Sequence, residues 1–348
     1  MTFYRQSIRS TLLLNLLYLN RTKLRHCHSV ISKEIKIPTP YGHIAAKEFG
    51  DRSGHQILAI HGFMDNCATF DTLIPNIIDK MNVHVIAMDE PGGGHSSKLP
   101  IGADLSQFTI IKEMKRVVNH LKWTNFSIIG HSYGAFNSIL FASIYPRLVQ
   151  SVVALDTYGS RLCREYSPLK RPMAKTIDMI LDFEQKVMNK ANADSYEKVY
   201  HNEHEAIERV MNAGSLRMFD YSHRIPEKAA TLYVKRGMKS YNNGLIFTRD
   251  YRHKMPMLGL IPVKNDYLEK LKSIRCDLLL VMADDGLFKD YEGREQWFNI
   301  YEKQCRYFKE IVLKGQHYIH IDEEDLVGTH ISNFIKESLS RGLHDEYN

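Results

Sequence analysis

The stretch NFSIIGHSYGAFN, residues 125–137, determines how the rest of this chain is interpreted. Residues 126–129 are apolar enough for a buried strand, and residues 135–144 are compatible with a helix. Ser132 therefore falls in a sharp turn between a strand and a helix. A serine in that context is a candidate nucleophile, whereas the same five-residue pattern in an ordinary loop would carry little information.

The two glycines beside Ser132 are what such a turn needs. A strand that passes directly into a helix brings the backbone into close contact with itself, so the residues two before and two after the serine must have almost no side chain. Gly130 and Gly134 meet that requirement. The hydroxyl of Ser132 would then stand clear of the sheet, and the N–H of Tyr133 would point toward an oxyanion formed on it.

Short apolar runs bounded by turn residues recur along the chain and predict buried strands of a parallel sheet. Two runs at the start alternate and predict an antiparallel hairpin. The predicted strands are residues 32–38, 43–49, 56–60, 83–88, 126–129, 151–155, 276–282 and 308–313. Helical patterns lie between them at residues 70–81 and 105–121, and a closing helix is expected at residues 323–339.

A glycine-rich loop follows the strand at residues 83–88 and reads DEPGGGHS, residues 89–96. Glycine-rich loops can bind phosphate through backbone N–H groups. No Lys-Ser or Lys-Thr pair follows these glycines, so a nucleotide-binding P-loop is not supported. We interpret the loop as a tight backbone crossing next to the site.

The strand pattern stops between residues 157 and 272. This interval is rich in methionine and aromatic residues and contains helical patterns, including residues 173–188 and 203–211. An inserted helical unit that covers the site would explain the interruption. Methionines at helical spacing are more often core residues than substrate contacts, although a methionine-rich interior would also suit an apolar pocket.

These motifs together resemble the α/β-hydrolase superfamily. The Gly-x-Ser-x-Gly turn corresponds to its nucleophile elbow, and Asp89, Gly92, Gly94 and Ser96 match its Asp-x-x-Gly-x-Gly-x-Ser loop. The resemblance implies an α/β-hydrolase fold, in which a mostly parallel eight-stranded sheet has helices on both faces and an inserted helical cap.

The resemblance also implies a division of the chain into five parts. These are a basic extension at residues 1–33, a core at 34–156 and 273–340 that is interrupted by the cap at 157–272, and a tail at 341–348.

Within the superfamily, the chain is similar to the serine hydrolase-like proteins, a subgroup that includes the fly protein kraken. The segments that carry this similarity are residues 61–66, 70–75 and 248–252, together with the elbow. The resemblance implies a second oxyanion donor, the N–H of Phe63, after the His61-Gly62 pair. We interpret His61 itself as a structural imidazole that hydrogen bonds to backbone.

The same resemblance implies a catalytic triad in the order serine, acid, histidine. Ser132 is the nucleophile, and His317 is the expected base because it lies on the loop after the last strand. His320, three residues later, is the less favoured alternative and is expected to be a packed neighbour of the site.

The acid is open between three aspartates. Family members usually carry Gly-x-x-Asp after the penultimate strand, and aligning Met282 with that glycine selects Asp285. Because Met282 replaces the family glycine, the alignment can shift by one residue, and Asp284 remains an alternative. Asp156 is the third candidate, because some members of the superfamily take the acid from the strand before the cap.

Charge and cysteine content argue against several other classes of protein. Residues 1–33 contain six Lys or Arg and no acid, so the remaining residues balance 40 basic against 40 acidic side chains. A nucleic-acid-binding domain would need a basic face, which this balance does not indicate. The five cysteines are odd in number and lack a Cys-x-x-Cys pair, which favours reduced thiols inside the cell over disulfides or a zinc site.

The basic N-terminal segment, with its leucine cluster at residues 12–19, has the composition of a mitochondrial presequence. Two alternatives remain, an interfacial membrane anchor and a plain cytoplasmic extension. The apolar run is too short for a transmembrane helix, which needs about 20 residues.

The expected activity is hydrolysis of a carboxylic ester or thioester through an acyl-enzyme, with a small apolar acyl substrate and without a cofactor or metal. Hydrolysis of a carbon–carbon bond by the same triad is a related alternative. From another class, a catalytically silent scaffold with this fold is the alternative. Such relatives typically lose the serine or the histidine, and this chain has both.

Overall fold

The computed structural model describes residues 32–159, 170–189, 194, 197–212, 224–255, 264–289 and 293–342. The predictions for residues 1–31, namely mitochondrial import or membrane contact, lie outside the described residues, as do Cys27 and Cys163. The described cysteines Cys67, Cys276 and Cys305 are free thiols.

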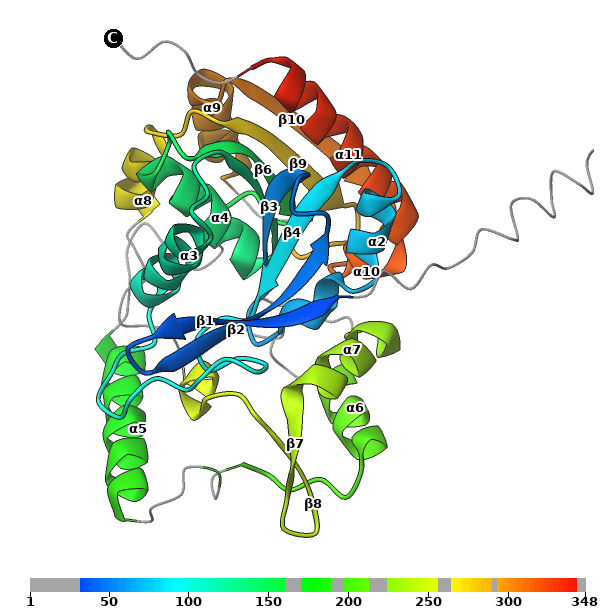
Figure 1. The fold of residues 1–348 in the computed structure, drawn as a ribbon. Helices are drawn as coiled ribbons and strands as arrows, with labels where there is room; N and C mark the ends of the chain where they lie inside the picture. The colour runs from blue at the N-terminus through cyan, green and yellow to red at the C-terminus, as the bar shows by residue number, and fades with distance from the viewer. Residues whose placement is uncertain are drawn as a thin grey trace, which may run out of the picture. The chain divides into compact units, whose positions relative to one another are not determined.

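An eight-stranded sheet forms the centre of the described chain (Figure 1). Its strand order is β1-β2-β4-β3-β5-β6-β9-β10. β1 pairs antiparallel with β2, and β2 with β4, while all later neighbours pair in parallel. The strands are β1 (Lys33–Thr39), β2 (Gly42–Gly50), β3 (His55–Ile60), β4 (Val83–Met88), β5 (Phe126–His131), β6 (Val149–Leu155), β9 (Asp277–Ala283) and β10 (Tyr307–Leu313). The expectation of a mostly parallel eight-stranded sheet is confirmed.

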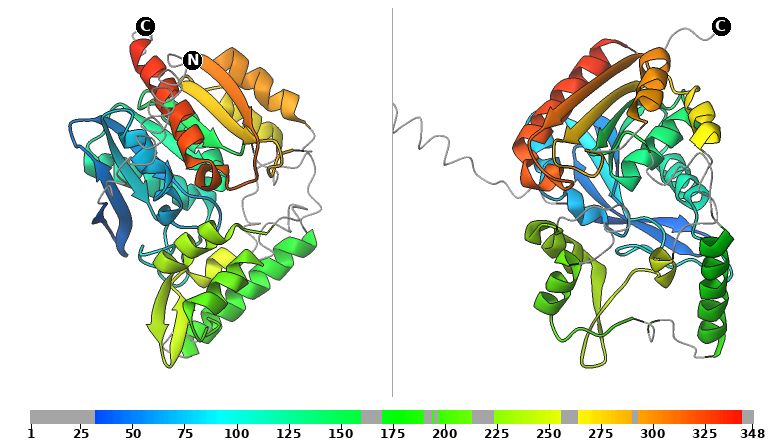
Figure 2. Two further views of the ribbon diagram at one scale, coloured as in Figure 1. Left: turned by 90° about the vertical axis from the view of Figure 1, so that its right-hand side faces the viewer. Right: turned by 180° about the vertical axis from the view of Figure 1, so that it is seen from behind.

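Helices cover both faces of this sheet (Figure 2). The helices α2 (Leu73–Ile78) and α11 (Glu324–Ser340) pack together on one face, and α11 continues from the short α10 (Ile319–Asp322). The other face carries α3 (Gln107–Leu121), α4 (Tyr133–Ile144), α8 (Lys264–Leu271) and α9 (Arg294–Gln304), which share one apolar core. Because both faces are covered, β4, β5, β6 and β9 are buried along their whole length, which explains their continuous apolar sequences.

The predicted helix at residues 70–81 is divided in the structure. A single 3₁₀ turn, η1 (Cys67–Phe70), precedes α2. The side chain of Asn66 caps that turn by accepting a hydrogen bond from the N–H of Ala68 at 3.1 Å. The local capping residue therefore starts a separate turn before the helix begins.

Between β6 and α8, the described elements are α5 (Lys170–Asn189), α6 (Glu203–Met211), α7 (Glu227–Gly237), β7 (Met238–Tyr241), β8 (Gly244–Phe247) and η4 (Tyr251–Lys254). We call the described residues from 170 to 255 the cap. The cap contains an antiparallel hairpin of β7 and β8, which the helical pattern of the sequence did not indicate. The helix α8 packs on α4 instead, through stacked rings of Phe136 and Tyr267 whose centroids are 4.3 Å apart.

Candidate active site

Ser132 lies at the turn between β5 and α4 in a strained backbone conformation, with φ 52° and ψ −119°. A Cβ atom added to Gly134 would lie 2.3 Å from the carbonyl oxygens of Ile60 and His61. One added to Gly130 would lie 2.4 Å from the Cα of Ala135. The expectation that both positions need glycine is therefore confirmed, since any side chain there would force the turn apart.

The structure places His317 between Ser132 and Asp156. Nε2 of His317 lies 3.0 Å from Oγ of Ser132, and Nδ1 lies 2.6 Å from Oδ2 of Asp156. All three residues are largely buried, with Asp156 fully enclosed. Because a carboxylate only accepts hydrogen bonds, Nδ1 carries the proton and Nε2 is left to accept the proton of the serine.

The prediction that Asp285 faces the histidine is wrong, because Nδ1 of His317 binds Asp156. The carboxylate of Asp285 is 38% exposed and forms an ion pair with Lys289 at 3.1 Å. Asp284 is also directed elsewhere, since its Oδ1 accepts a hydrogen bond from the N–H of Gly315 at 2.8 Å. Of the three aspartates weighed from the sequence, only Asp156 contacts the imidazole.

The loop after β9 contributes main-chain groups to the site instead of an acid. The N–H groups of Ala283 and Leu287 donate to the two carboxylate oxygens of Asp156, at 3.1 and 2.9 Å. A Cβ atom at Gly286 would lie 2.2 Å from Oδ1 of Asp156, so the loop can approach only because this residue is glycine. The Asp-Asp-Gly sequence thus marks the loop whose N–H groups bind Asp156. The prediction from sequence had assigned the acid itself to this loop.

The loop after β3 lies close to the serine. A Cβ atom at Gly62 would be 3.4 Å from the Cβ of Ser132. The N–H of Phe63 has no acceptor among the described residues, as expected of a group kept for an oxyanion. The rings of Phe63 and Tyr133 meet edge to face, 6.2 Å between centroids, next to the serine.

His61 joins this loop to the loop after β4. Its Nε2 accepts a hydrogen bond from the N–H of Glu90 at 3.0 Å, and its Nδ1 donates to the carbonyl of Gly62 at 2.8 Å. Burial lowers the pKa of His61 to about 4, so the ring is neutral near pH 7. The expected bonding of His61 to backbone is confirmed.

The segments that carried the subgroup resemblance connect the cap to the core. The Nδ2 of Asn66 donates to the carbonyl of Tyr233 on α7 at 2.9 Å. Thr248 donates through Oγ1 to the carbonyl of Gly94 at 2.7 Å. The guanidinium of Arg252 binds Asp250 and the carbonyls of Leu99 and Pro100, at 2.6 to 2.9 Å.

A buried ion pair that the sequence reasoning missed joins the cap to β1 and β4. Nε of Arg236, at the end of α7, binds Oδ2 of Asp89 at 3.0 Å, and its terminal nitrogens bind Glu34 at 2.5 and 3.0 Å. Burial favours the protonated form of Asp89, but the charge and hydrogen bonds of Arg236, with His61 and the N–H of Cys67, together outweigh burial and lower the pKa of that carboxyl below its usual value. Asp89, a residue of the family motif, is thus ionised and holds Arg236 of the cap.

Glu90 is a buried carboxyl without a cation. It is 1% exposed, and its Oε1 has no hydrogen-bond partner. Burial, with the nearby carboxyls of Asp65 and Asp89, raises the pKa of Glu90 from 4.5 to about 8. The folded protein therefore keeps a proton on Glu90 at neutral pH, whereas the unfolded chain releases it above about pH 4.5.

This difference predicts that Glu90 makes the protein less stable as the pH rises. Its contribution is unaffected below about pH 4.5 and is lost progressively up to pH 8, in total on the order of 5 kcal/mol. Glu90→Gln should therefore unfold in urea like the wild type at pH 5 and be measurably more stable than the wild type at pH 8. Parallel stability curves from pH 5 to pH 8 for the two proteins would contradict this prediction.

Two other features are absent from the part of the chain that the structure describes. No group of three or more His, Cys, Asp or Glu side chains there is arranged to hold a metal ion. Within the same residues, no helix is both long enough and apolar enough to cross a bilayer.

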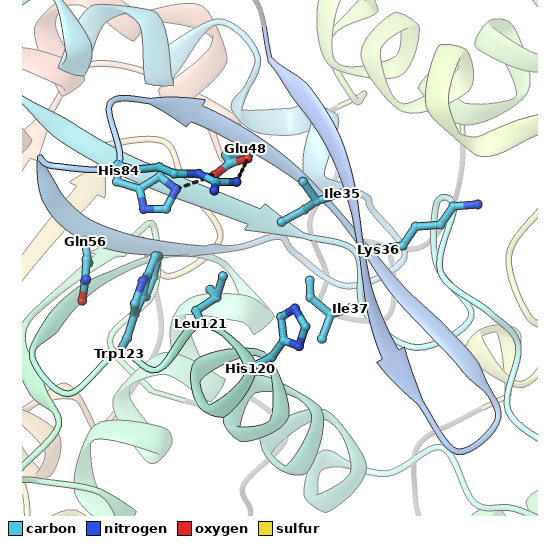
Figure 3. A pocket seen from close by; sticks show the side chains of 10 residues that line it. Ile35, Lys36, Ile37, Glu48, Gln56, His84, His120, Leu121 and Trp123 are labelled. Atoms are coloured by element: carbon cyan, nitrogen blue, oxygen red, sulfur yellow. Dashed lines mark hydrogen bonds and ion pairs between the residues drawn. The ribbon is translucent and has the colours of Figure 1, made fainter.

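A pocket of about 390 Å³ lies at the opposite ends of the strands, between the β1–β2 hairpin and the end of α3 (Figure 3). Its lining includes Gln56 and His84 at the starts of β3 and β4, whereas Ser132 follows the end of β5. The carboxylate of Glu48 accepts hydrogen bonds from Arg52 and His84 within this pocket. The pocket is therefore separate from the serine site.

Comparison with known proteins gives consistent matches. The family model described as the alpha/beta hydrolase fold matches residues 56–324. The chain is 29% identical over 310 residues to a serine hydrolase-like protein of Danio rerio, which covers 88% of this chain and 89% of that relative. It is 28% identical over 312 residues to a probable serine hydrolase of Drosophila melanogaster, covering 88% of each.

A similar solved structure is that of the hypothetical protein PA1622 from Pseudomonas aeruginosa PAO1. It is 25% identical in sequence, with a TM-score of 0.70, and the match covers 87% of this chain and 99% of that one. The likeness in sequence and in fold therefore extends over most of the chain.

Proposed function

Since this chain belongs to the α/β-hydrolase family, we propose that it is a serine hydrolase that cleaves a carboxylic ester or thioester. The observation that supports the proposal is the pair of hydrogen bonds that links Ser132 to His317 at 3.0 Å and His317 to Asp156 at 2.6 Å. A hydroxyl is a poor nucleophile at neutral pH, and this arrangement supplies the base that it needs.

In the proposed reaction, Oγ of Ser132 attacks the carbonyl carbon of the substrate while Nε2 of His317 takes the hydroxyl proton. Asp156 stabilises the resulting imidazolium. The N–H groups of Phe63 and Tyr133 hold the negative charge that develops on the carbonyl oxygen. His317 then protonates the leaving group, and water, activated by the same imidazole, releases the acid from Ser132.

The proposed substrate has an apolar acyl or alcohol part. Phe63 and Met64 are partly exposed on the loop beside the serine, and Phe63 meets the ring of Tyr133 there. Aromatic and thioether side chains at the entrance of a site favour contact with hydrocarbon.

A fluorophosphonate probe and a panel of p-nitrophenyl esters from acetate to palmitate test the proposal on the full chain. We expect the probe to modify the folded protein once, with the adduct mapped by mass spectrometry to the peptide that contains Ser132. We expect hydrolysis to be faster for esters longer than acetate. A well-folded protein that neither reacts with the probe nor hydrolyses any ester would favour the scaffold role.

A further inference from the structure

Three buried imidazoles pack side by side at the site, with neighbouring rings tilted by 43° and 44°, and the proposed reaction uses only one of them, His317. The ring of His131 lies between His317 and His320, with centroid separations of 4.7 and 4.2 Å. All three side chains are at most 1% exposed. His131 is the last residue of β5 and immediately precedes Ser132, so it belongs to the same rigid strand as the nucleophile.

His131 is bonded to the main chain of the base itself. Its Nε2 lies 2.9 Å from the carbonyl oxygen of His317. A carbonyl only accepts, so the proton of His131 is on Nε2. Burial, followed by the neighbouring His320 and His317, lowers the pKa of His131 well below its ordinary value, which keeps the ring neutral and this tautomer constant at neutral pH.

The loop that carries His317 is also attached to the core before the histidine. At Gly315, its N–H donates to Asp284 at 2.8 Å and its carbonyl accepts from the N–H of Asp285 at 3.0 Å. Gly315 has a φ of +155° and no side chain to hold it in place. At His317, two residues further along, the ring is held by Asp156 at 2.6 Å, and the main-chain carbonyl accepts the bond from His131 at 2.9 Å.

His320 packs against the other side of the His131 ring, and its own ring is not hydrogen bonded to this loop. Its Nε2 lies 3.0 Å from Oγ1 of Thr69, which belongs to η1. Burial lowers the pKa of His320 to about 3, so it too is neutral at neutral pH. His320 is therefore a matched control for His131. It is also a buried histidine in the same group of rings, but its ring has no hydrogen bond to the main chain of His317.

We propose that His131 is a positioning residue for His317, because its Nε2–H fixes the carbonyl of the base to the strand that ends at the nucleophile. The ring of His131 also packs against the imidazole of His317, so that the hydrogen bond and the ring contact together set the distance from Nε2 of His317 to Oγ of Ser132. A displacement of about 1 Å between reacting groups can cost 10²-fold in rate. The kinetic part of this inference rests on the proposed function.

Three variants separate the hydrogen bond from the packing. His131→Phe keeps a flat ring and removes the donor, whereas His131→Gln keeps an N–H donor that can reach the carbonyl. His320→Phe replaces the ring on the other side of His131 and leaves the hydrogen bond from His131 to His317 in place. We expect kcat for the preferred p-nitrophenyl ester to fall about 30- to 100-fold in His131→Phe with KM within about 2-fold of the wild type. His131→Gln should recover to within about 5-fold, and His320→Phe should stay within about 3-fold.

Proton–nitrogen correlation spectra of protein labelled with nitrogen-15 in histidine provide a readout that needs no activity. They report which ring nitrogen of each histidine carries the proton. We expect Asp156 to hold the proton of His317 on Nδ1 in all four proteins. We expect that Nδ1–H signal to be sharp in the wild type, in His131→Gln and in His320→Phe, and to be broadened by exchange with water in His131→Phe. If the wild type hydrolyses nothing, the proposed function fails, and these spectra still decide the role of His131.

Either of two results would overturn the inference. The first is a His131→Phe protein with the kcat and the sharp His317 Nδ1–H signal of the wild type. The second is an equal loss of kcat in His131→Phe and His131→Gln with unchanged His317 spectra, which would show that only core packing is involved.

Discussion

Replacing Ser132 with alanine is expected to lower kcat/KM for ester hydrolysis by about 10⁴-fold or more and to abolish labelling by the fluorophosphonate probe. In the proposed reaction the hydroxyl oxygen forms the acyl-enzyme, and alanine leaves nothing for His317 to deprotonate. The remaining rate would come from binding and from the oxyanion donors alone. The change removes a single oxygen atom from a turn whose backbone is unaltered, so thermal unfolding should stay close to that of the wild type.

Ser143→Ala is the matched control for this variant. Ser143 is also buried, lies on the helix that follows the elbow, and donates to the carbonyl of Leu140 at 2.8 Å. Its loss should leave turnover and labelling near the wild-type values. A Ser132→Ala protein that keeps a tenth of the wild-type turnover would show that a different residue is the nucleophile.

Replacing Asp156 with asparagine is expected to lower kcat by about 10³- to 10⁴-fold. One terminal atom of the asparagine amide is an NH2 group, which donates and cannot accept. Nδ1 of His317 is then no longer favoured as the protonated nitrogen, and the imidazole adopts the wrong tautomer. The imidazolium formed during the reaction also loses its compensating charge. The substitution preserves side-chain size in a site where Gly286 leaves no spare room.

Asp285→Asn distinguishes this acid from the one that the family pattern suggested. Because Asp285 is exposed and paired with Lys289, its amide variant should keep kcat within about 3-fold of the wild type. The measurement is kcat for one p-nitrophenyl ester at several pH values, with circular dichroism as the check on folding. A large loss in Asp285→Asn together with a small one in Asp156→Asn would reverse the assignment.

The strands were accessible from sequence because each has a simple physical cause. Buried parallel strands must be apolar on both faces, and β4 was predicted to the residue. The turn at Ser132 was equally readable, since its two glycines meet backbone atoms at less than 2.5 Å once a Cβ is added. The pattern of strand, serine turn and helix can be read from residues that are neighbours in the chain, although Gly134 itself meets the end of β3.

The acid could not be chosen from sequence, because that choice depends on contacts between separate segments. Asp156 and Asp285 both follow buried strands, and the spacing of residues in the chain does not show which carboxylate receives the N–H groups of Ala283 and Leu287. Gly286 is the one local signal, because a glycine after an acidic pair suggests a close approach of backbone. The hairpin in the cap was missed for a similar reason, since β7 and β8 have only four residues each and form through their mutual pairing.

Because Asp156 lies at the end of β6, most of the groups in the proposed catalytic site precede the cap in the chain. The nucleophile, the acid and both oxyanion donors come from one continuous segment, residues 63–156, and every cap residue follows it. Only the base is contributed from beyond the cap, where β9 and β10 return the chain to the sheet. A change in the length of the cap therefore leaves the segment 63–156 intact and requires only that His317 still returns to the same place.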